Sequence, residues 1–511
     1  MFILDVDAAV SAFYTVFALD TALFIALGVV IGISVGAIPG LAHTLPIALV
    51  LPFSFILPFH QTLGILIGTY KGGNFGGSIT AISFGTPGVS GAAATVADGY
   101  ALTKQGKGKK ALDMGLYSSI TGDVFSDIVL IFLVVPIGMF APRFGPGELT
   151  VLYLLALSLV VIFTAKDPGR GIISAGIGFF LAIIGRDVIQ GTVRFHFGIT
   201  FLRAGFPLVA FLMGFFAVPE IIAQVYHIIK NPRAAVNGQV RAKEFEEKIL
   251  KKKEEGLKWK EFIGAWRGIG LGSLLGTALG ALPGPGATLA SYTAHSVTSQ
   301  FTKDKNYGKG SLEGVAAAES ANNATVGATF IPTLTFGVPG SSIAALLMAA
   351  LIMEGVPIGP RVVVDHTETV YTLFLLLILA NPFNLVAGRL LIPVYSRLTK
   401  LPPEILWPVI AIFLTVGVYA YVSRAFDITI MLISGLLGYF FRWYKITDAP
   451  LILAFLVAPL FEPNLRQAMI LSRGDPRFFF SSEIMIVLWV ILVLSMAFFI
   501  RGQRKAAKMK E

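Results

Sequence analysis

Hydrophobic residues run through this chain in long segments separated by short polar turns. A helix needs about 20 apolar residues to cross the hydrocarbon of a bilayer, and several segments approach that length. The pattern predicts helices near 16–38, 41–57, 62–83, 88–101, 112–141, 147–165, 169–185, 205–229, 264–282, 284–300, 314–336, 339–355, 368–393, 404–422, 425–441, 449–465 and 484–500. Segments beside Pro-Gly breaks are too short to span alone, so we expect half-helices or hairpin arms there.

Two Pro-Gly interruptions occur twice along the chain, in the same order. GAIPGLAHTLPIA at 36–48 corresponds to GALPGPGATLASY at 280–292, and FGTPG at 84–88 corresponds to FGVPG at 336–340. This order indicates an internal duplication. Pro and Gly normally end helices, and irregular backbone at membrane depth is tolerated only where it is buried in protein or lines a watery cavity. Paired breaks in duplicated halves therefore predict a transport site.

Basic residues lie at different places in the two copies. The first copy carries Lys104, Lys107, Lys109 and Lys110 after its second break, and the second copy carries Lys303, Lys305 and Lys309 before its second arm. In the second copy the loop after the second break has only Arg361, and in the first copy the loop before the second arm has no basic residue. Because basic loops face the cytoplasm, this exchange predicts repeats of inverted topology. The expected fold is an all-α polytopic membrane protein whose broken helices and hairpins meet near the bilayer midplane.

The basic residues of the central loop and of the C-terminal tail predict the orientation of the chain in the membrane and the boundaries of its domains. The loop 230–262 holds ten Lys or Arg and six Glu, and the tail from Arg501 holds five basic residues, so both are expected in the cytoplasm. Counting crossings then places the N-terminus outside a plasma membrane. We expect an N-terminal repeat with following helices at 1–229, a basic linker at 230–262, a C-terminal repeat at 263–441, and additional helices with a cytoplasmic tail at 442–511.

Composition excludes several other classes of protein. Hydrophobic residues make up 55% of the chain and charged residues 14%, which is typical of a membrane protein embedded in lipid. The net charge of +10 lies in loops, where it orients the chain, so no nucleic acid is expected as a partner. The absence of cysteine excludes thiolate catalysis and Cys-based zinc sites. No GxSxG, HExxH or Walker motif occurs, so we expect neither an enzyme nor a cofactor beyond a coupling ion, Na⁺ or H⁺.

The breaks predict an anion site. Helix N-termini and free backbone N–H groups attract negative charge, and the small hydroxyl residues beside the breaks let a ligand approach closely. The alternative is that these small residues serve tight helix packing. The candidate substrate-binding residues are Pro39, Gly40, Thr44, Lys71, Asn74, Gly77, Ser78, Thr86, Pro87, Gly88, Pro283, Gly284, Gly286, Thr288, Pro339, Gly340 and Ser341.

Charged and amide side chains inside the apolar segments leave alternatives open. Lys71 is either a counter-charge for a carboxylate ligand or the partner of a nearby acid. Glu319, Asn322 and Asn323 share one helix face, where their oxygens suit a coupling cation such as sodium, or form an interhelical hydrogen-bond cluster. Asp123 and Asp127 also share a face, for which structural pairing is the expected explanation.

The breaks and the segments beside them resemble one family. GAIPGL, YKGGNFGGSITAI, ADGYALTKQGKGKKAL, LPGPGATLASY and KGSLEGVAAAESANNATVGATFIPTLTFGVPGS are similar to the large integral subunit of the tripartite tricarboxylate transporters, over about residues 16–460. Lys71 departs from this pattern, because the family usually has an aromatic residue there. Gly85 stands where Asn is usual, and Ala42 and His43 stand where Gly-Pro is usual.

The resemblance implies a secondary active importer, a symporter of small carboxylates driven by a proton or sodium gradient. It also implies a small four-helix membrane subunit and an extracytoplasmic solute-binding protein as partners, besides membrane lipid. Two alternatives remain: an ion channel built on the same broken helices, and a membrane-embedded enzyme acting on lipid, for which we would expect a cluster of His or acidic residues near one interface.

Overall fold

The computed structural model describes residues 5–38, 44–54, 56–140, 143–164, 167–230, 255–284, 286–356, 358–359, 361–393 and 403–508. Helices make up most of this structure and strands almost none of it, which confirms the prediction of an all-α polytopic fold. The first half contains α1 (Val6–Phe17), α2 (Leu19–Gly36), α3 (Leu45–Ser54), α4 (Phe59–Phe84), η1 (Ser90–Ala93), α5 (Val96–Lys104), α6 (Gly108–Phe140), α7 (Pro146–Thr164), α8 (Pro168–Ala182), the strands β1 (Gly185–Arg186) and β2 (Val193–Arg194), η3 (Thr200–Ala204) and α9 (Leu208–Lys230).

The second half begins after the basic linker, most of which lies outside the described residues. It contains α11 (Trp259–Gly264), α12 (Trp266–Gly280), α13 (Gly286–Phe301), α14 (Leu312–Ala328), α15 (Phe330–Phe336), α16 (Ser342–Met353), α17 (Val362–Asp365), α18 (Thr367–Leu391), α20 (Pro403–Val422), α21 (Ala425–Trp443), α22 (Ala449–Leu471), η5 (Pro476–Phe480) and α23 (Glu483–Lys508).

Among the described residues, seven helices are long and apolar enough to cross a membrane: α2, α6, α7, α9, α18, α21 and α22. Shorter apolar helices, such as α8 and α16, lie between them. Several apolar segments are divided where the sequence pattern suggested one helix. The chain preceding α2 forms the separate helix α1, because Asp5 caps its start and Ala18 is extended at its end. The segment 88–101 is divided into η1 and α5.

The two halves repeat the same local structures. In the first half α2 packs along α4, and in the second half α12 packs along α14. A Cβ on Gly32 of α2 would lie 2.3 Å from the carbonyl oxygen of Thr69, and a Cβ on Gly276 of α12 would lie 2.5 Å from that of Ala321. Gly32 and Gly276 are equivalent positions of the duplication, so close backbone approach at glycine is a feature of both copies.

The second breaks also match in conformation. α4 ends at Gly85 with φ of 69°, and α15 ends at Gly337 with φ of 70°. Left-handed backbone of this kind favours glycine, and it turns the chain sharply at a helix C-terminus. The duplication seen in the sequence therefore has a counterpart in geometry in the paired helices and at the second break.

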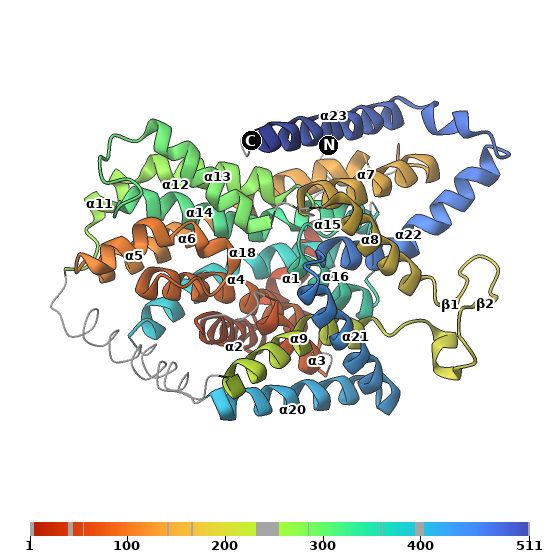
Figure 1. Cartoon of the computed structure of the whole chain (residues 1–511), viewed down its shortest axis with the longest axis horizontal. Helices are drawn as coiled ribbons and strands as arrows, with labels where there is room; N and C mark the ends of the chain where they lie inside the picture. The colour runs from red at the N-terminus through yellow and green to blue at the C-terminus, as the bar shows by residue number, and fades with distance from the viewer. Residues whose placement is uncertain are drawn as a thin grey trace.

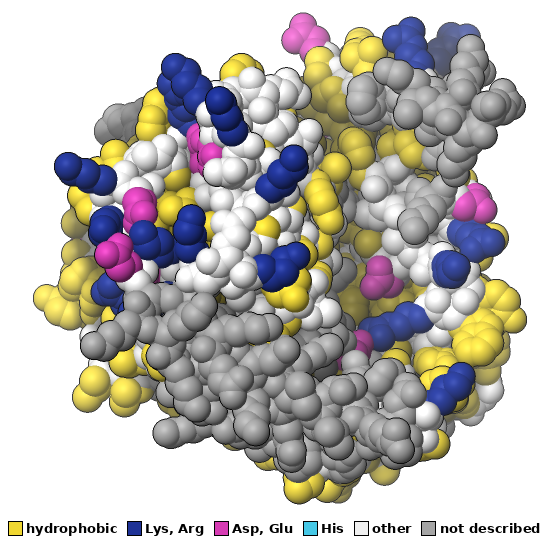
Figure 2. Space-filling model, turned by 60° about the vertical axis from the view of Figure 1, so that its left-hand side comes forward, with side chains coloured by type: hydrophobic (Ala, Val, Ile, Leu, Met, Phe, Trp, Pro, Cys, Tyr) yellow, Lys and Arg dark blue, Asp and Glu magenta, His cyan; other side chains and the backbone are white. Residues whose placement is uncertain are grey.

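Figure 1 shows the arrangement of these elements around α4. In that view α2 and α3 lie towards the bottom and α12–α14 lie at the upper left, while α20 and α23 run along opposite edges and the β1–β2 hairpin projects from one side. α4 is buried on every face from Gln61 to Ser83. The main apolar core is formed by α3, α4, α9, α16, α18 and α20–α22. Figure 2 shows Lys and Arg side chains gathered on the side that carries α5 and α11, beside broad hydrophobic areas.

Candidate functional site

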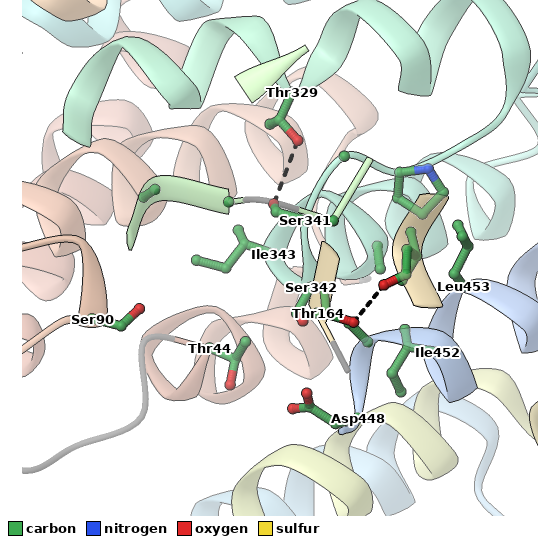
Figure 3. A pocket seen from close by; sticks show the side chains of 18 of the residues that line it. Thr44, Ser90, Thr164, Thr329, Ser341, Ser342, Ile343, Asp448, Ile452 and Leu453 are labelled. Carbon is green, nitrogen blue, oxygen red and sulfur yellow. Dashed lines mark hydrogen bonds between the residues drawn. The ribbon is translucent and has the colours of Figure 1, made fainter. Parts of the chain in front are cut away.

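A cavity of about 350 Å³ lies where the two halves and the C-terminal helices meet. Small-molecule sites in proteins usually occupy about 300–1,000 Å³, so the cavity suits a small ligand. Figure 3 shows side chains from the first half, from the α15–α16 break and from α22 around it. Hydroxyl groups are common in the lining, which includes Thr44, Tyr70, Ser90, Thr164, Thr288, Thr325, Thr329, Ser341, Ser342 and Thr447.

The two breaks of the second half meet at this cavity. The backbone N–H of Gly284 donates to the carbonyl of Gly340 at 3.4 Å, which joins the break before α13 to the break before α16. Both helices therefore start at the cavity wall. Ser341 is the N-cap of α16, where its hydroxyl accepts a hydrogen bond from the Ala344 N–H at 3.1 Å. Unpaired N–H groups at such helix starts favour bound anions.

Two segments of the first half reach the same cavity. Thr44 lines it at the start of α3, and Ser90 lines it at the start of η1. The break that precedes η1 is held by the Gly88 N–H, which donates to the Gly77 carbonyl at 3.0 Å. The starts of four segments, two from each half, are thus brought together.

One cationic side chain lines the cavity among the described residues. Arg442, at the end of α21, lies 2.7 Å from the Glu220 carboxylate of α9, which also accepts a hydrogen bond from Gln224 at 3.0 Å. Asp448, the residue before α22, contributes a carboxyl group to the same wall. The cavity therefore combines hydroxyl donors and helix starts with a cation that already has an acidic partner.

The structure brings some of the candidate substrate-binding residues together and separates others. Those that line the cavity are Thr44, Gly284, Gly286, Thr288, Pro339, Gly340 and Ser341. Pro283 is buried beside it, Thr86 and Pro87 are half-buried in the first-half break, and Asn74, Gly77, Ser78 and Gly88 are buried away from the lining. Pro39 and Gly40 lie outside the described residues.

Lys71 does not line the cavity. Its ammonium group is fully buried, and it donates to the Asp127 carboxylate at 2.6 Å and to the Asn381 amide oxygen at 2.7 Å. Asp123 lies 3.5 Å from the same nitrogen. Of the two interpretations that the sequence left open, pairing with a nearby acid is the one these contacts bear out.

Glu319 lies at the centre of a buried polar cluster between α4, α6 and α14. Its carboxylate accepts hydrogen bonds from Ser78 at 2.5 Å and Ser119 at 3.2 Å, and also from Thr95. Asn323 donates to Ser119 at 2.7 Å. These contacts cross between helices, so they form the hydrogen-bond cluster that the sequence offered as one alternative.

Two amide groups in this cluster keep unused oxygens. Among the described residues, the side-chain oxygens of Asn322 and Asn323 accept no hydrogen bond although both side chains are fully buried. A Cβ on Gly91 of η1 would lie 1.9 Å from the Asn322 oxygen, so η1 presses directly on this amide. The hydroxyl of Thr325, which lines the cavity, donates to the backbone carbonyl of Asn322 at 2.7 Å. The cavity and the Glu319 cluster are therefore adjacent.

Several cavity residues carry little signal in the sequence. Tyr70, Thr164, Thr329, Arg442, Thr447 and Asp448 were not among the candidates. Tyr70 is the neighbour of Lys71. A hydropathy period of 3.6 residues would have separated their faces, but α4 shows no such period and is buried all round. Arg442 and Asp448 flank a loop between apolar helices, and charges at such places are common in membrane proteins.

The fold defines a polytopic helical membrane protein, and its cavity is of a size that suits a small molecule. The model of the Tripartite tricarboxylate transporter TctA family matches residues 22–453, so the chain belongs to this family. It is a subunit of a transport system and not an enzyme, and the tripartite organisation of the family implies further subunits.

Two relatives come from Agrobacterium vitis. An uncharacterized 52.8 kDa protein in the TAR-I ttuC' 3' region is 31% identical over 459 residues, which cover 90% of this chain and 89% of the relative. An uncharacterized protein in the TAR-II ttuC' 3' region is 37% identical over 210 residues, which cover 41% of this chain and 87% of the relative. No solved structure matches the chain.

Proposed function

We propose that this subunit is a gradient-driven importer of small carboxylates, of the di- or tricarboxylate class, and that the cavity is its anion site. One observation carries the proposal: the starts of α3, η1, α13 and α16 meet at a single cavity lined by hydroxyl groups. Carboxylates are strong hydrogen-bond acceptors, and hydroxyl and N–H donors at helix starts are suited to them. Arg442, which is paired with Glu220, is the cationic side chain of the wall.

The ion-coupling residues in this proposal are Glu319, Asn322 and Asn323. Unused amide oxygens near a buried carboxylate are ligands that a hard cation such as sodium prefers. The Thr325 hydroxyl of the cavity wall donates to the backbone carbonyl of Asn322 in the same helix, so an ion at this cluster and an anion in the cavity would stabilise the same arrangement of α14. Binding of one would then favour binding of the other.

The wider proposal includes the architecture and the partners. The two copies would be inverted repeats, with the N-terminus outside and the C-terminus in the cytoplasm, and transport would move one helical unit against another. The first-half break at Thr86, Pro87 and Gly88 would position η1 against the anion. A solute-binding protein outside the membrane would deliver the substrate, and a small four-helix subunit would lie beside this one.

Uptake into proteoliposomes tests the proposal. Purified protein, with and without the partner subunits, is supplied with radiolabelled mono-, di- and tricarboxylates under separately imposed sodium and proton gradients. We expect uptake of a di- or tricarboxylate that ends when the gradient is collapsed. A flux of ions without coupled substrate movement would instead identify a channel.

The isosteric variant Glu319→Gln tests the coupling cluster. Removing the carboxylate charge while keeping its shape should abolish gradient-driven uptake but leave exchange of substrate across the membrane, because exchange needs no net ion movement. Glu220→Gln, which frees Arg442 at the cavity, is the comparison variant and should change substrate affinity instead. Unchanged driven uptake in Glu319→Gln would remove Glu319 from the coupling mechanism.

A further inference from the structure

A second group of buried charges lies apart from the cavity lining and from the Glu319 cluster. It comprises Lys71 of α4, Asp123 and Asp127 of α6, and Asn381 of α18, all at most 2% exposed. We refer to these four residues as the Lys71 cluster. The substrate-binding mechanism proposed above makes no use of it.

The Lys71 cluster has one more negative than positive charge. A single ammonium faces two carboxylates, at 2.6 Å from Asp127 and 3.5 Å from Asp123. Removing an uncompensated charge from water costs several kcal/mol, and such groups inside membrane proteins are found paired or at ion pathways. The second carboxylate therefore needs a further positive charge.

Among the described residues, no second cationic side chain forms an ion pair with Asp123 or Asp127. The ionisable side chains acting on Asp123 are Lys71 and Asp127. α14 packs against α6, and its Glu319 and Glu313 accept hydrogen bonds from hydroxyl groups. α18 also packs against α6. Its Glu368 accepts from the Ser11 hydroxyl, and its Arg389 lies over the Tyr117 ring. Asn381 and Asn384 of α18 are neutral, and the Asn384 amide donates to the Lys71 carbonyl at 3.4 Å.

The two carboxylates are bonded very differently. Asp127 accepts from the Lys71 ammonium and, at 2.8 Å, from the Asn381 amide. Among the described residues, neither oxygen of Asp123 accepts a hydrogen bond, although the side chain is fully buried. Asp127 is stabilised as an anion by these contacts, whereas Asp123 is not. A neutral, protonated Asp123 would balance the cluster.

A proton fits this place better than a metal cation does. The Lys71 ammonium already occupies the position within ion-pair distance of both carboxylates. A sodium ion beside it would meet repulsion from a fixed positive charge, and it would also need several oxygen ligands arranged around it. A proton needs one oxygen with a free lone pair, which Asp123 provides.

The Lys71 cluster is mechanically connected to the cavity through α4. Tyr70, the residue before Lys71, lines the cavity, and its hydroxyl is hydrogen-bonded to Ser341. A ligand that displaces Tyr70 would also turn or shift Lys71, and so would change the distance between the ammonium and Asp123. Protonation of Asp123 and occupancy of the cavity are thereby linked.

We propose that Asp123 carries one exchangeable proton that is transported together with the carboxylate. The carboxylate of Asp123 takes a proton from water on the outer side and releases it to water on the inner side, while Lys71 remains paired with Asp127. This inference rests on the proposed function and specifies a proton as a coupling ion, at a site separate from Glu319.

Proteoliposomes that contain the wild type or Asp123→Asn test the inference. With the membrane potential clamped at zero, each coupled proton supports about a tenfold accumulation of substrate per unit of pH difference. We expect this accumulation in the wild type and none in Asp123→Asn, while both variants exchange internal for external substrate. Asp123→Glu should restore driven accumulation. Asp427→Asn is the matched control, because Asp427 is also buried and ion-paired, with Arg424 at 3.2 Å, and it should behave as the wild type.

Exchange and accumulation separate the two proposals. If the wild type exchanges no carboxylate at all, the proposed function fails. If exchange occurs but Asp123→Asn still accumulates substrate along a pH gradient, the assignment of the proton site to Asp123 is wrong. The assignment is also wrong if only a sodium gradient drives accumulation by the wild type.

Infrared spectroscopy provides a measurement that does not depend on transport or on the substrate. A protonated carboxyl group gives a C=O stretching band that shifts on exchange into heavy water. We expect such a band in the wild type, dependent on pH and absent from Asp123→Asn but present in Asp427→Asn. A wild-type spectrum without a band attributable to Asp123 at any pH would overturn the inference.

Discussion

At the scale of single residues, Ser341 has two structural tasks. Its hydroxyl caps α16 and faces the cavity beside Thr329, 3.5 Å away (Figure 3). Ser341→Ala should lower stability by about 1 kcal/mol through loss of the cap. It should also weaken carboxylate binding by about ten- to 100-fold, since a hydrogen bond to a charged group contributes about 1.5–3 kcal/mol. Thermal unfolding and substrate titration measure the two effects.

Ser482→Ala is the matched control for that prediction. The Ser482 hydroxyl accepts from the Met485 N–H at 3.2 Å near the start of α23, outside the cavity lining. It should lose similar stability and bind substrate normally. Equal affinity in the wild type and Ser341→Ala would mean that Ser341 acts only as a cap.

Asp187, in the turn between β1 and β2, predicts a dependence on pH. Backbone N–H groups of Gln190 and Ile189 and the Arg466 guanidinium lower the pKa of Asp187 from 3.8 to about 2. The folded pKa is below the unfolded one, so this contribution to stability is complete above about pH 4 and is lost as the pH falls through 2. Pepsin cleavage of the hairpin should therefore increase over that interval.

Asp187→Asn should remove this dependence. The amide cannot titrate, and it forms no ion pair with Arg466 or Arg194, so the hairpin should be cleaved at a rate that follows only the protease's own pH profile. Asp475→Asn, which removes a different capping carboxylate, serves as the control and should retain the wild-type dependence. A hairpin equally resistant at pH 2 and pH 4 would contradict the prediction.

At the scale of elements, the stability of the helix pairs depends on close backbone contact at glycine. Gly276→Ala on α12 would place a methyl group 2.5 Å from the Ala321 carbonyl oxygen, so the helices must separate. We expect a loss of about 1–3 kcal/mol, measured by thermal unfolding in detergent. Gly270→Ala, on the same helix with no atom within 4 Å of the added group, should be neutral or stabilising.

The sequence predicted elements better than it predicted which faces of them meet. The Pro-Gly breaks were visible because Pro and Gly act locally on the backbone, and the structure places the breaks before α13 and α16 at the cavity. Lys71 was expected in the anion site, yet its neighbour Tyr70 lines the cavity. α4 is buried on all sides, so no polar face indicates how it is rotated, and a difference of one residue turns a side chain by about 100°.

Other parts of the site depend on contacts between distant segments. Thr447 and Asp448 reach the cavity because α22 packs against α7, α8 and α16, and hydropathy contains no information on such pairings. The partners of Glu319 come from α4, from α6 and from the segment before α5, so its hydrogen bonds were not visible in its own helix.

At the scale of the whole molecule, the arrangement of the two copies in the membrane is open to a direct test. Lys107 and Arg361 are exposed and follow the equivalent second breaks of the two copies. Inverted repeats require them to be on opposite faces. Because the chain has no cysteine, Lys107→Cys and Arg361→Cys each introduce a single thiol. An impermeant maleimide applied to intact cells should label Arg361→Cys at once and Lys107→Cys only after permeabilisation.

The unsubstituted chain is the control for background labelling, and Gln190→Cys in the β1–β2 turn should be labelled from outside like Arg361→Cys. Labelling of Lys107→Cys and Arg361→Cys from the same side would show that the copies are parallel, and the anion site would then need another geometric explanation.

Tyr70 and Lys71 are neighbours on the buried helix α4, and this affects how the substrate and the coupling ion of such a transporter can change in evolution. Tyr70 lines the cavity, and Lys71 lies beside Asp123, the carboxylate proposed to carry the coupled proton. A mutation that reshapes α4 for a new nutrient would therefore alter both at once. Related transporters should therefore differ in substrate and coupling ion together more often than in one of them alone.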